Sequence, residues 1–275
     1  MKNVQISDQS MKEFFVRTLN KDYLKENFDM SIKTNSSYKI TNRIDLYKYR
    51  ENLRILYSED ECEEILNILI AVYHILIDYF DMPILIELLI NNFTDIEWSI
   101  FLDYNFEKGE RSIKRDHFKH QFRNVFLGWI LLYEYNIVSK IINNEDMTEF
   151  TTYLKLNDID LNNKTIKRII FKTYFIAALF HDIGYPLTHY IKSSNRIQNF
   201  HPFYRVINAN VKIPFEEIRS CLKTSLLFYA VREEQLREKY INNDHGFYSS
   251  ISFLMNFYSN GYIFSLEKEE RCIIE

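Results

Sequence analysis

The chain contains few of the residues that interrupt helices. Only five glycines and four prolines occur in 275 residues. This number is low for a protein built from many strands, because the tight turns between strands favour glycine and proline. The apolar fraction is 47%, which is enough for the packed core of one large domain. The composition therefore predicts an all-α fold.

The sequence also lacks paired cysteines, a signal peptide and a membrane span, and these absences indicate a cellular compartment. The three cysteines, Cys62, Cys221 and Cys272, lie far apart and form no CxxC pair, so we interpret them as free thiols in a reducing cytoplasm. The N-terminal residues lack the apolar core of a signal peptide. The most apolar run, residues 65–80, is interrupted by polar residues and is shorter than the roughly 20 residues of a bilayer span. We therefore expect a cytoplasmic protein that does not associate with membranes.

The charge balance gives no sign of a global nucleic-acid-binding surface. The net charge is −4 and the isoelectric point is near 6.0. Proteins that bind nucleic acid through their overall field are usually basic. A nucleic-acid substrate would therefore depend on a local basic pocket.

Apolar residues recur with helical spacing in several segments. Residues 61–80 are apolar on most sides, which is typical of a central helix, and the acidic run at 59–61 suits a helix N-terminus. Further helices are predicted at 112–135, 165–180, 188–199, 214–239 and 246–258. The charged stretch around Gly109 suggests a boundary. We predict a helical N-terminal region at 1–110 and a second domain at 111–275.

Histidine and aspartate gather at three places in the second domain. The segments are RDHFKH at 115–120, the pair His181-Asp182 after an apolar helix, and DHG at 244–246. Imidazole nitrogens and carboxylate oxygens are the ligands of hydrolytic divalent metals, which also need an open position for water. Gly184 and Pro186 should end the helix, so the His-Asp pair is predicted at its C-terminus, where both side chains can converge.

Each of these residues also has an ordinary structural interpretation. A His-Asp pair alone is a weak motif, and His181-Asp182 could be a hydrogen-bonded cap. His120 could be a surface histidine in a basic run. Asp244 could cap the helix that follows it. His74, inside the apolar helix 61–80, is interpreted as a hydrogen-bonded core histidine.

Together with their flanking residues, the three segments resemble the HD superfamily of metal-dependent phosphohydrolases. KHQFRNVFLG is similar to the helix that carries the first histidine of the family, and AALFHDIGYP to its His-Asp segment. DHGFYSSISFL resembles a segment of some two-metal members. The likeness covers residues 112–258 and implies an HD-type helical bundle with an added N-terminal helical region. It implies that the metal ligands are His120, His181, Asp182 and, for a second ion, His245.

The resemblance also implies a reaction. One or two divalent ions (Mn, Mg, Fe, Ni or Zn) would activate water for attack on a phosphoryl group. Asp182 would bridge two ions or orient the nucleophile, and His117 would lie near the substrate. Lys119 and Arg123 would bind non-bridging phosphate oxygens. The implied substrate is a nucleotide, a cyclic nucleotide or a nucleic-acid phosphodiester.

Two departures from the family pattern support an alternative. Tyr185 stands where many members have lysine, and no histidine or aspartate follows His245, although the family has a closing aspartate on a later helix. Either the second domain continues beyond Glu275, or its site is degenerate. The alternative function is therefore a catalytically degenerate HD-like module that binds nucleotide or a partner protein as a sensor. A third interpretation is that the chain is a helical protein-interaction module in which the His-Asp pair is incidental. The sequence does not decide whether the protein forms homo-oligomers.

Overall fold

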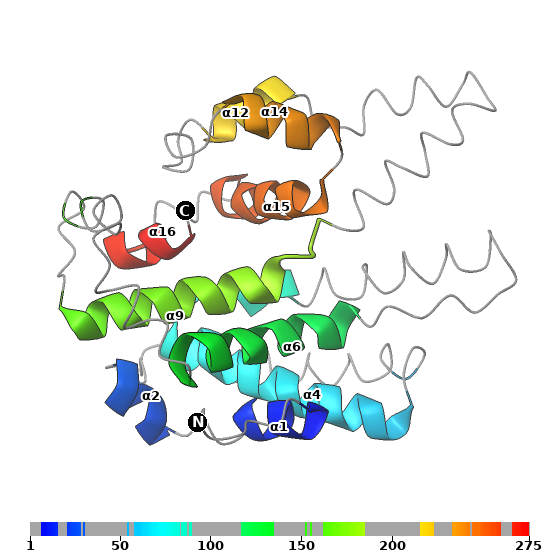
Figure 1. The fold of residues 1–275 in the computed structure, drawn as a ribbon, viewed down its shortest axis with the longest axis vertical. Helices are drawn as coiled ribbons and strands as arrows, with labels where there is room; N and C mark the ends of the chain where they lie inside the picture. The colour runs from blue at the N-terminus through cyan, green and yellow to red at the C-terminus, as the bar shows by residue number, and fades with distance from the viewer. Residues whose placement is uncertain are drawn as a thin grey trace, which may run out of the picture. The chain divides into compact units, whose positions relative to one another are not determined.

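The structure is a computed structural model of the chain (Figure 1). It describes residues 7–15, 21–28, 30, 54, 58–82, 84–86, 88–89, 117–134, 152, 155, 162–184, 215–222, 233–242, 244–259 and 266–274. Within these ranges every regular element is a helix and no strand occurs, which confirms the predicted all-α class. The helix predicted at 188–199 and the domain boundary predicted at 110–111 lie outside the described residues.

The chain divides into two compact units that interleave along the sequence. The first contains Met1–Thr94 and Phe118–Leu179, and the second contains Asp95–His117 and Phe180–Glu275. The described helices that lie wholly or almost wholly in the first unit include α1 (Asp8–Glu13), α2 (Lys21–Phe28), α4 (Glu59–His74), η3 (Ile75–Tyr79), α6 (His117–Trp129), η4 (Ile130–Glu134) and α9 (Asn163–Phe180). The elements η3 and η4 are single π-helical turns that continue α4 and α6.

Three of these helices match the long helices predicted from apolar spacing. The segment predicted at 61–80 is α4 with η3, and the segment at 165–180 is α9. The segment at 112–135 is helical over 117–134, where it is described. Polar residues set the N-termini, as capping rules expect. The Glu61 carboxylate accepts a hydrogen bond from the Ser58 amide at 3.0 Å, and the side chain of Asn162 accepts one from the amide of Thr165 at 2.8 Å.

Aromatic side chains form the core of the first unit. The rings of Phe28 and Phe171 stack at 4.6 Å between centroids, and Trp129 stacks on Tyr133 at the same distance. Phe80 meets Phe171 edge-on at 6.0 Å. Such pairs contribute about 0.5–1.5 kcal/mol each beyond their burial. Aromatic residues make up 16% of the chain, and the rings named here contribute to the packing of this core.

Helices α6 and α9 run side by side in opposite directions (Figure 1). The hydroxyl of Tyr133 donates to the carbonyl oxygen of Lys167 at 3.3 Å, and the hydroxyl of Tyr174 donates to that of Asn124. Moving toward the start of α6 therefore corresponds to moving toward the end of α9. This register places His120 at the level of the last residues of α9.

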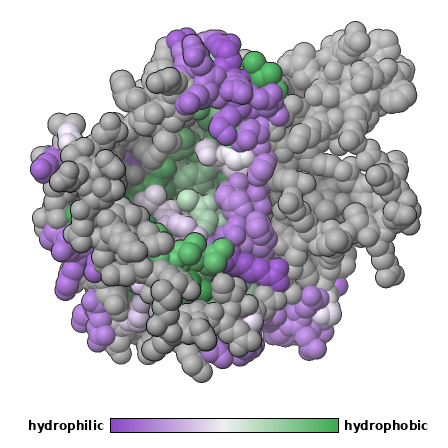
Figure 2. Space-filling view, viewed as in Figure 1, coloured by the Kyte–Doolittle hydropathy of each residue, from purple (hydrophilic) through white to green (hydrophobic). Residues whose placement is uncertain are grey.

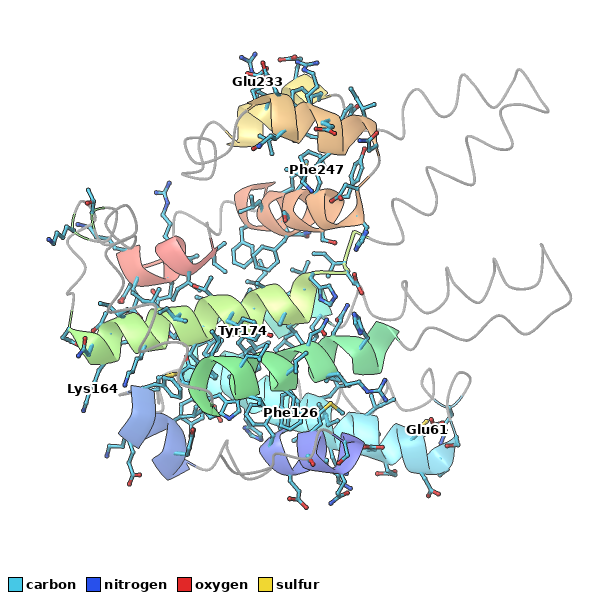
Figure 3. The ribbon with its side chains drawn as sticks, viewed as in Figure 1. Glu61, Phe126, Lys164, Tyr174, Glu233 and Phe247 are labelled. Atoms are coloured by element: carbon cyan, nitrogen blue, oxygen red, sulfur yellow. The ribbon has the colours of Figure 1, made fainter. Side chains whose placement is uncertain are left out.

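A glycine allows this close approach. Gly128 lies inside α6, where glycine costs about 1 kcal/mol relative to alanine, so its presence needs a reason. A Cβ at this position would lie 1.6 Å from Cζ of Tyr174. Figure 3 shows Tyr174 at the junction of the two helices and Phe126 on the other side of α6, where it meets Phe14. The ring of Tyr174 thus occupies the space of the missing side chain.

Gly128→Ala is expected to lower the free energy of unfolding by about 1–3 kcal/mol, although alanine usually stabilises a helix. The Tyr174 ring would have to move and would lose its hydrogen bond to Asn124. Chemical denaturation followed by circular dichroism would measure the change. In a Tyr174→Ala background the same substitution should be neutral or stabilising. Equal destabilisation in both backgrounds would contradict this explanation of the glycine.

The second unit contains four described helices. They are α12 (Phe215–Leu222), α14 (Glu233–Ile241), α15 (His245–Ser259) and α16 (Lys268–Ile274). Both α12 and α14 contact α15. The helix predicted at 246–258 is confirmed as α15, and the segment predicted at 214–239 is helical in α12 and α14, with residues 223–232 outside the described residues.

Ion pairs join α12 to α14 on a hydrophilic surface (Figure 2). The guanidinium of Arg219 lies 3.3 Å from Glu216 and 3.0 Å from Glu233. Arg237 lies over the ring of Phe215, 4.4 Å from its centroid. Exposed ion pairs contribute little to stability, so the packing of Phe215 under Arg237 is the stronger contact.

The helix α16 was not predicted from the sequence. The sequence feature that could have indicated the start of this helix is the spacing of Glu267 and Glu270. The Glu270 carboxylate accepts a hydrogen bond from the Glu267 amide at 3.1 Å and so caps the first turn. None of the helices in the described ranges has the length and apolar character needed to cross a bilayer. The side chain of Cys62 is a buried free thiol, and those of the other two cysteines are outside the description.

Candidate metal centre

The predicted His-Asp pair lies in the turn that follows α9. Residues 181–184 form this turn, in which the amide of Ile183 donates to the carbonyl oxygen of Phe180 at 3.2 Å. This confirms the predicted position of the pair at a helix C-terminus. The side chain of His181 is 32% exposed and that of Asp182 only 7%. The carboxylate is therefore buried, whereas the imidazole can reach solvent.

Gly184 fixes this turn against the first turns of α15. Its amide donates to the hydroxyl of Ser249 at 2.9 Å, and that hydroxyl donates to the carbonyl oxygen of His245 at 2.8 Å. A Cβ on Gly184 would lie 2.2 Å from the backbone nitrogen of Ser249, so only glycine permits this approach. The two backbones are in direct contact, which holds the segment carrying Asp182 beside the segment carrying His245.

The Asp182 carboxylate has an imidazole on each oxygen. Its Oδ2 lies 3.3 Å from Nε2 of His181, and its Oδ1 lies 3.8 Å from Nε2 of His245. The buried carboxylate oxygens and the imidazole nitrogens of His181 and His245 therefore lie close together in one small volume. This arrangement favours a cation, because carboxylate oxygen and imidazole nitrogen both bind divalent metals.

Asp244 serves as the N-cap of α15, as its ordinary interpretation proposed. Its Oδ1 accepts a hydrogen bond from the amide of Phe247 at 2.8 Å, and its Oδ2 lies 3.5 Å from Nζ of Lys239. The bond from the Phe247 amide is the main cause that lowers the pKa of Asp244, and the Lys239 charge lowers it further. The cap and a site role for His245 do not exclude each other, since Asp244 caps the helix while His245 faces Asp182.

His120 completes a group of three metal-binding side chains. It is exposed on α6, at the level of the end of α9. One ligand atom from each of His120, His181 and Asp182 lies within 4.8 Å of the others, so these residues could hold a metal ion. Two ligands of one ion about 2.1 Å away lie at most about 4.2 Å apart, so small side-chain rotations would suffice. His245 lies outside this group and touches it through Asp182.

The other predicted site residues are only partly described. His117 begins α6 and Lys119 lies in its first turn, but the side chains of both are outside the description, as is Tyr185. Arg123 is exposed on α6, one turn after His120. The structure thus brings three predicted ligands together and leaves the roles of the predicted phosphate-binding residues as predictions.

His74 is a correction to the sequence interpretation. Its Nδ1 lies 2.9 Å from Oδ2 of Asp78, so the ring is hydrogen-bonded, as expected. Its side chain is nevertheless 39% exposed and does not belong to the core. The reason is that α4 buries its apolar face, and His74 and Asp78, four residues apart, lie together on the other side.

Gln121 is a polar residue that the sequence did not single out. It directly follows His120 and is fully buried, and neither atom of its amide has a hydrogen-bond partner among the described residues. Burying an amide without partners costs about 1–3 kcal/mol. No sequence signal could have indicated this, since glutamine is usually exposed on helices.

Gln121→Met is therefore expected to raise the free energy of unfolding by about 1–2 kcal/mol, because methionine has a similar shape and no polar group to desolvate. Denaturant unfolding would measure the change. Gln9→Met, at an exposed position of α1, is the matched control and should stay within about 0.5 kcal/mol of the parent protein. A fall in stability on Gln121→Met would show that the amide has a partner.

Comparisons of the chain with models of protein families, with curated proteins and with solved structures gave no match. What bears on a function is therefore the chemistry of the site itself: His120, His181 and Asp182, which could hold a metal ion, on a scaffold that is helical in the described ranges.

Proposed function

We propose that the protein is a divalent-metal-dependent phosphohydrolase with an HD-type helical bundle, in which His120, His181 and Asp182 bind the ion. The observation that carries the proposal is the approach of these three ligand atoms to within 4.8 Å of one another. They come from two segments about 60 residues apart in sequence, one in α6 and one at the end of α9.

The donor set limits the choice of ion. Two imidazole nitrogens and one carboxylate oxygen suit Zn, Fe, Mn or Ni, whereas Mg prefers oxygen ligands. Three protein ligands leave coordination positions for water and substrate, as catalytic sites require. A bound divalent ion would supply Lewis acidity to a phosphoryl oxygen and lower the pKa of a water molecule.

The chain's own residues supply the rest of the proposed chemistry. The Asp182 carboxylate is buried, which favours a fixed orientation toward the ion and the attacking water. His245, 55% exposed and 3.8 Å from Asp182, can bind a second ion or accept a proton. Arg123, with Lys119 and His117, would bind phosphate oxygens at the start of α6. The substrate class is a nucleotide, a cyclic nucleotide or a nucleic-acid phosphodiester, and the last would need a local basic pocket.

A sensor that binds a metal and a nucleotide without turnover is the second candidate. One observation favours it: among the described residues the metal group consists of three side chains, His120, His181 and Asp182. A site with three protein ligands can bind an ion and a phosphate and still lack the group that activates water.

The test combines metal analysis with a substrate panel. Metal content of the purified protein and titration with Zn²⁺ or Mn²⁺ would establish binding. Turnover of bis(4-nitrophenyl) phosphate, nucleoside triphosphates and cyclic nucleotides would then be measured with each ion. Binding with turnover supports the hydrolase, and nucleotide binding without turnover supports the sensor. Absence of metal binding at micromolar concentrations would reject both proposals.

A further inference from the structure

Ser249 is a polar residue of α15 that is almost completely buried, with 2% of its surface exposed. Its hydroxyl group accepts a hydrogen bond from the amide of Gly184 at 2.9 Å and donates one to the carbonyl oxygen of His245 at 2.8 Å. The direction of both bonds is fixed, because a backbone amide can only donate and a carbonyl oxygen can only accept. The hydroxyl therefore connects the turn 181–184 to the first turn of α15.

The bond that Ser249 donates is ordinary, whereas the bond that it accepts is not. Serine inside a helix commonly donates to the carbonyl oxygen four residues earlier. The neighbouring Ser250 is exposed and does the same, since its hydroxyl donates to the carbonyl oxygen of Gly246 at 3.0 Å. What distinguishes Ser249 is the bond from Gly184, which lies 65 positions earlier in the chain. This bond holds together two segments that are distant in sequence.

The turn held by this bond carries two of the three proposed ligands. His181 and Asp182 directly precede Ile183 and Gly184 in the same turn. A short turn at the end of a helix makes few hydrogen bonds of its own, so contact with another segment limits its movement. Ligands bind a metal tightly only if their segments are held to within about 0.5 Å of the binding geometry. Support of the turn from α15 therefore bears directly on the affinity of the site.

We infer that Ser249 is the positioning residue of the turn 181–184, and that its hydroxyl strengthens cation binding by holding His181 and Asp182 in place. This inference rests on the proposed metal-binding function. It goes beyond the ligand set, because it assigns the group that orients two ligands through the backbone of Gly184. A group that favours the binding conformation raises the affinity, and the bound cation in return stabilises that conformation.

Removal of the hydroxyl is expected to loosen the turn. Ser249→Ala leaves the buried amide of Gly184 without its acceptor, which is unfavourable. We expect the Zn²⁺ affinity, measured by calorimetric titration, to fall by about 10-fold or more. We also expect the Gly184 amide of the metal-free protein to exchange with solvent deuterium at least about fivefold faster, as measured by NMR.

Ser250→Ala is the matched control. It removes a hydroxyl from the adjacent position of the same helix and breaks the same type of bond to the carbonyl oxygen four residues earlier, but it leaves the Gly184 amide bonded. We expect the Zn²⁺ affinity and the exchange of the Gly184 amide to stay at the values of the parent protein. Equal loss of Zn²⁺ affinity in Ser249→Ala and Ser250→Ala would show a general weakening of α15 and would overturn the inference.

Ser249→Thr restores the hydroxyl at the same position. Threonine in a helix can make the same bond to the carbonyl oxygen four residues earlier, and its oxygen can accept the Gly184 amide. We expect slow amide exchange and a Zn²⁺ affinity close to that of the parent protein. If the added methyl group prevents the bond, fast exchange and weak binding should occur together. Slow exchange with weak binding, or fast exchange with tight binding, would overturn the inference.

The exchange measurements separate this inference from the proposed function. Absence of Zn²⁺ binding by the parent protein would reject the proposed function, while exchange in the metal-free proteins would still decide whether Ser249 holds the turn. Equal exchange of the Gly184 amide in the parent and Ser249→Ala proteins would overturn the inference. Denaturation curves would establish that each variant is folded under the titration conditions. If Ser249→Ala does not fold, the comparison of Ser249→Thr with the parent protein decides by the same criteria.

Discussion

Replacing Asp182 by asparagine is expected to abolish metal binding and any phosphohydrolase activity, with little change in shape. The substitution removes the charge of the buried ligand and leaves an amide, which is a poor ligand for transition metals. We expect Zn²⁺ affinity to fall more than the about 10–100-fold that loss of an outer hydrogen-bond partner costs. Calorimetric titration and metal analysis would measure the loss. His181→Ala should give the same result.

Asp78→Asn is the matched control for this experiment. Asp78 also lies beside a histidine, at 2.9 Å from His74, but it belongs to the α4–η3 segment and not to the metal group. We expect Asp78→Asn to leave metal content and hydrolysis unchanged. Full metal content and rate in Asp182→Asn would show that the site has been assigned to the wrong residues.

Gly184→Ala is expected to destabilise the second unit strongly. The new Cβ would lie 2.2 Å from the nitrogen of Ser249 and 2.5 Å from the carbonyl carbon of Tyr248. Both atoms are backbone, so no side-chain rotation can relieve the overlap. We expect a loss of about 3 kcal/mol of unfolding free energy. Displacement of the turn would also separate Asp182 from His245 and weaken metal binding.

Gly246→Ala is the control with the same chemical change two residues into the N-terminal turn of α15. Its Cβ would meet only Oδ1 of Asp244, at 3.3 Å, and this side chain can give way slightly. We expect its stability to stay within about 0.5 kcal/mol of the parent protein. Thermal and denaturant unfolding of the two variants would be compared. Equal stability of both would contradict the close backbone approach at Gly184.

Local sequence features predicted much of the helical structure. Apolar residues recur every three or four positions in 61–80, 165–180 and 246–258, because one face of each helix is buried. This period involves only residues that are close in sequence, so it can be recognised without the tertiary structure. The position of His181-Asp182 followed from Gly184, which ends the helix. The missed helix α16 is short and acidic at its start. Its apolar stripe is too brief to show a period.

The sequence by itself determined the all-α class, the helix that leads to His181-Asp182 and the residue types that favour a metal. Only the tertiary structure decided that Gly184 touches Ser249, that His245 faces Asp182 and that the Gln121 amide is buried with no hydrogen-bond partner in the part of the chain that the structure describes. These facts depend on contacts between segments far apart in sequence. Their geometry follows from packing and register, such as the Tyr174 ring over Gly128, which leaves no periodic trace in the chain.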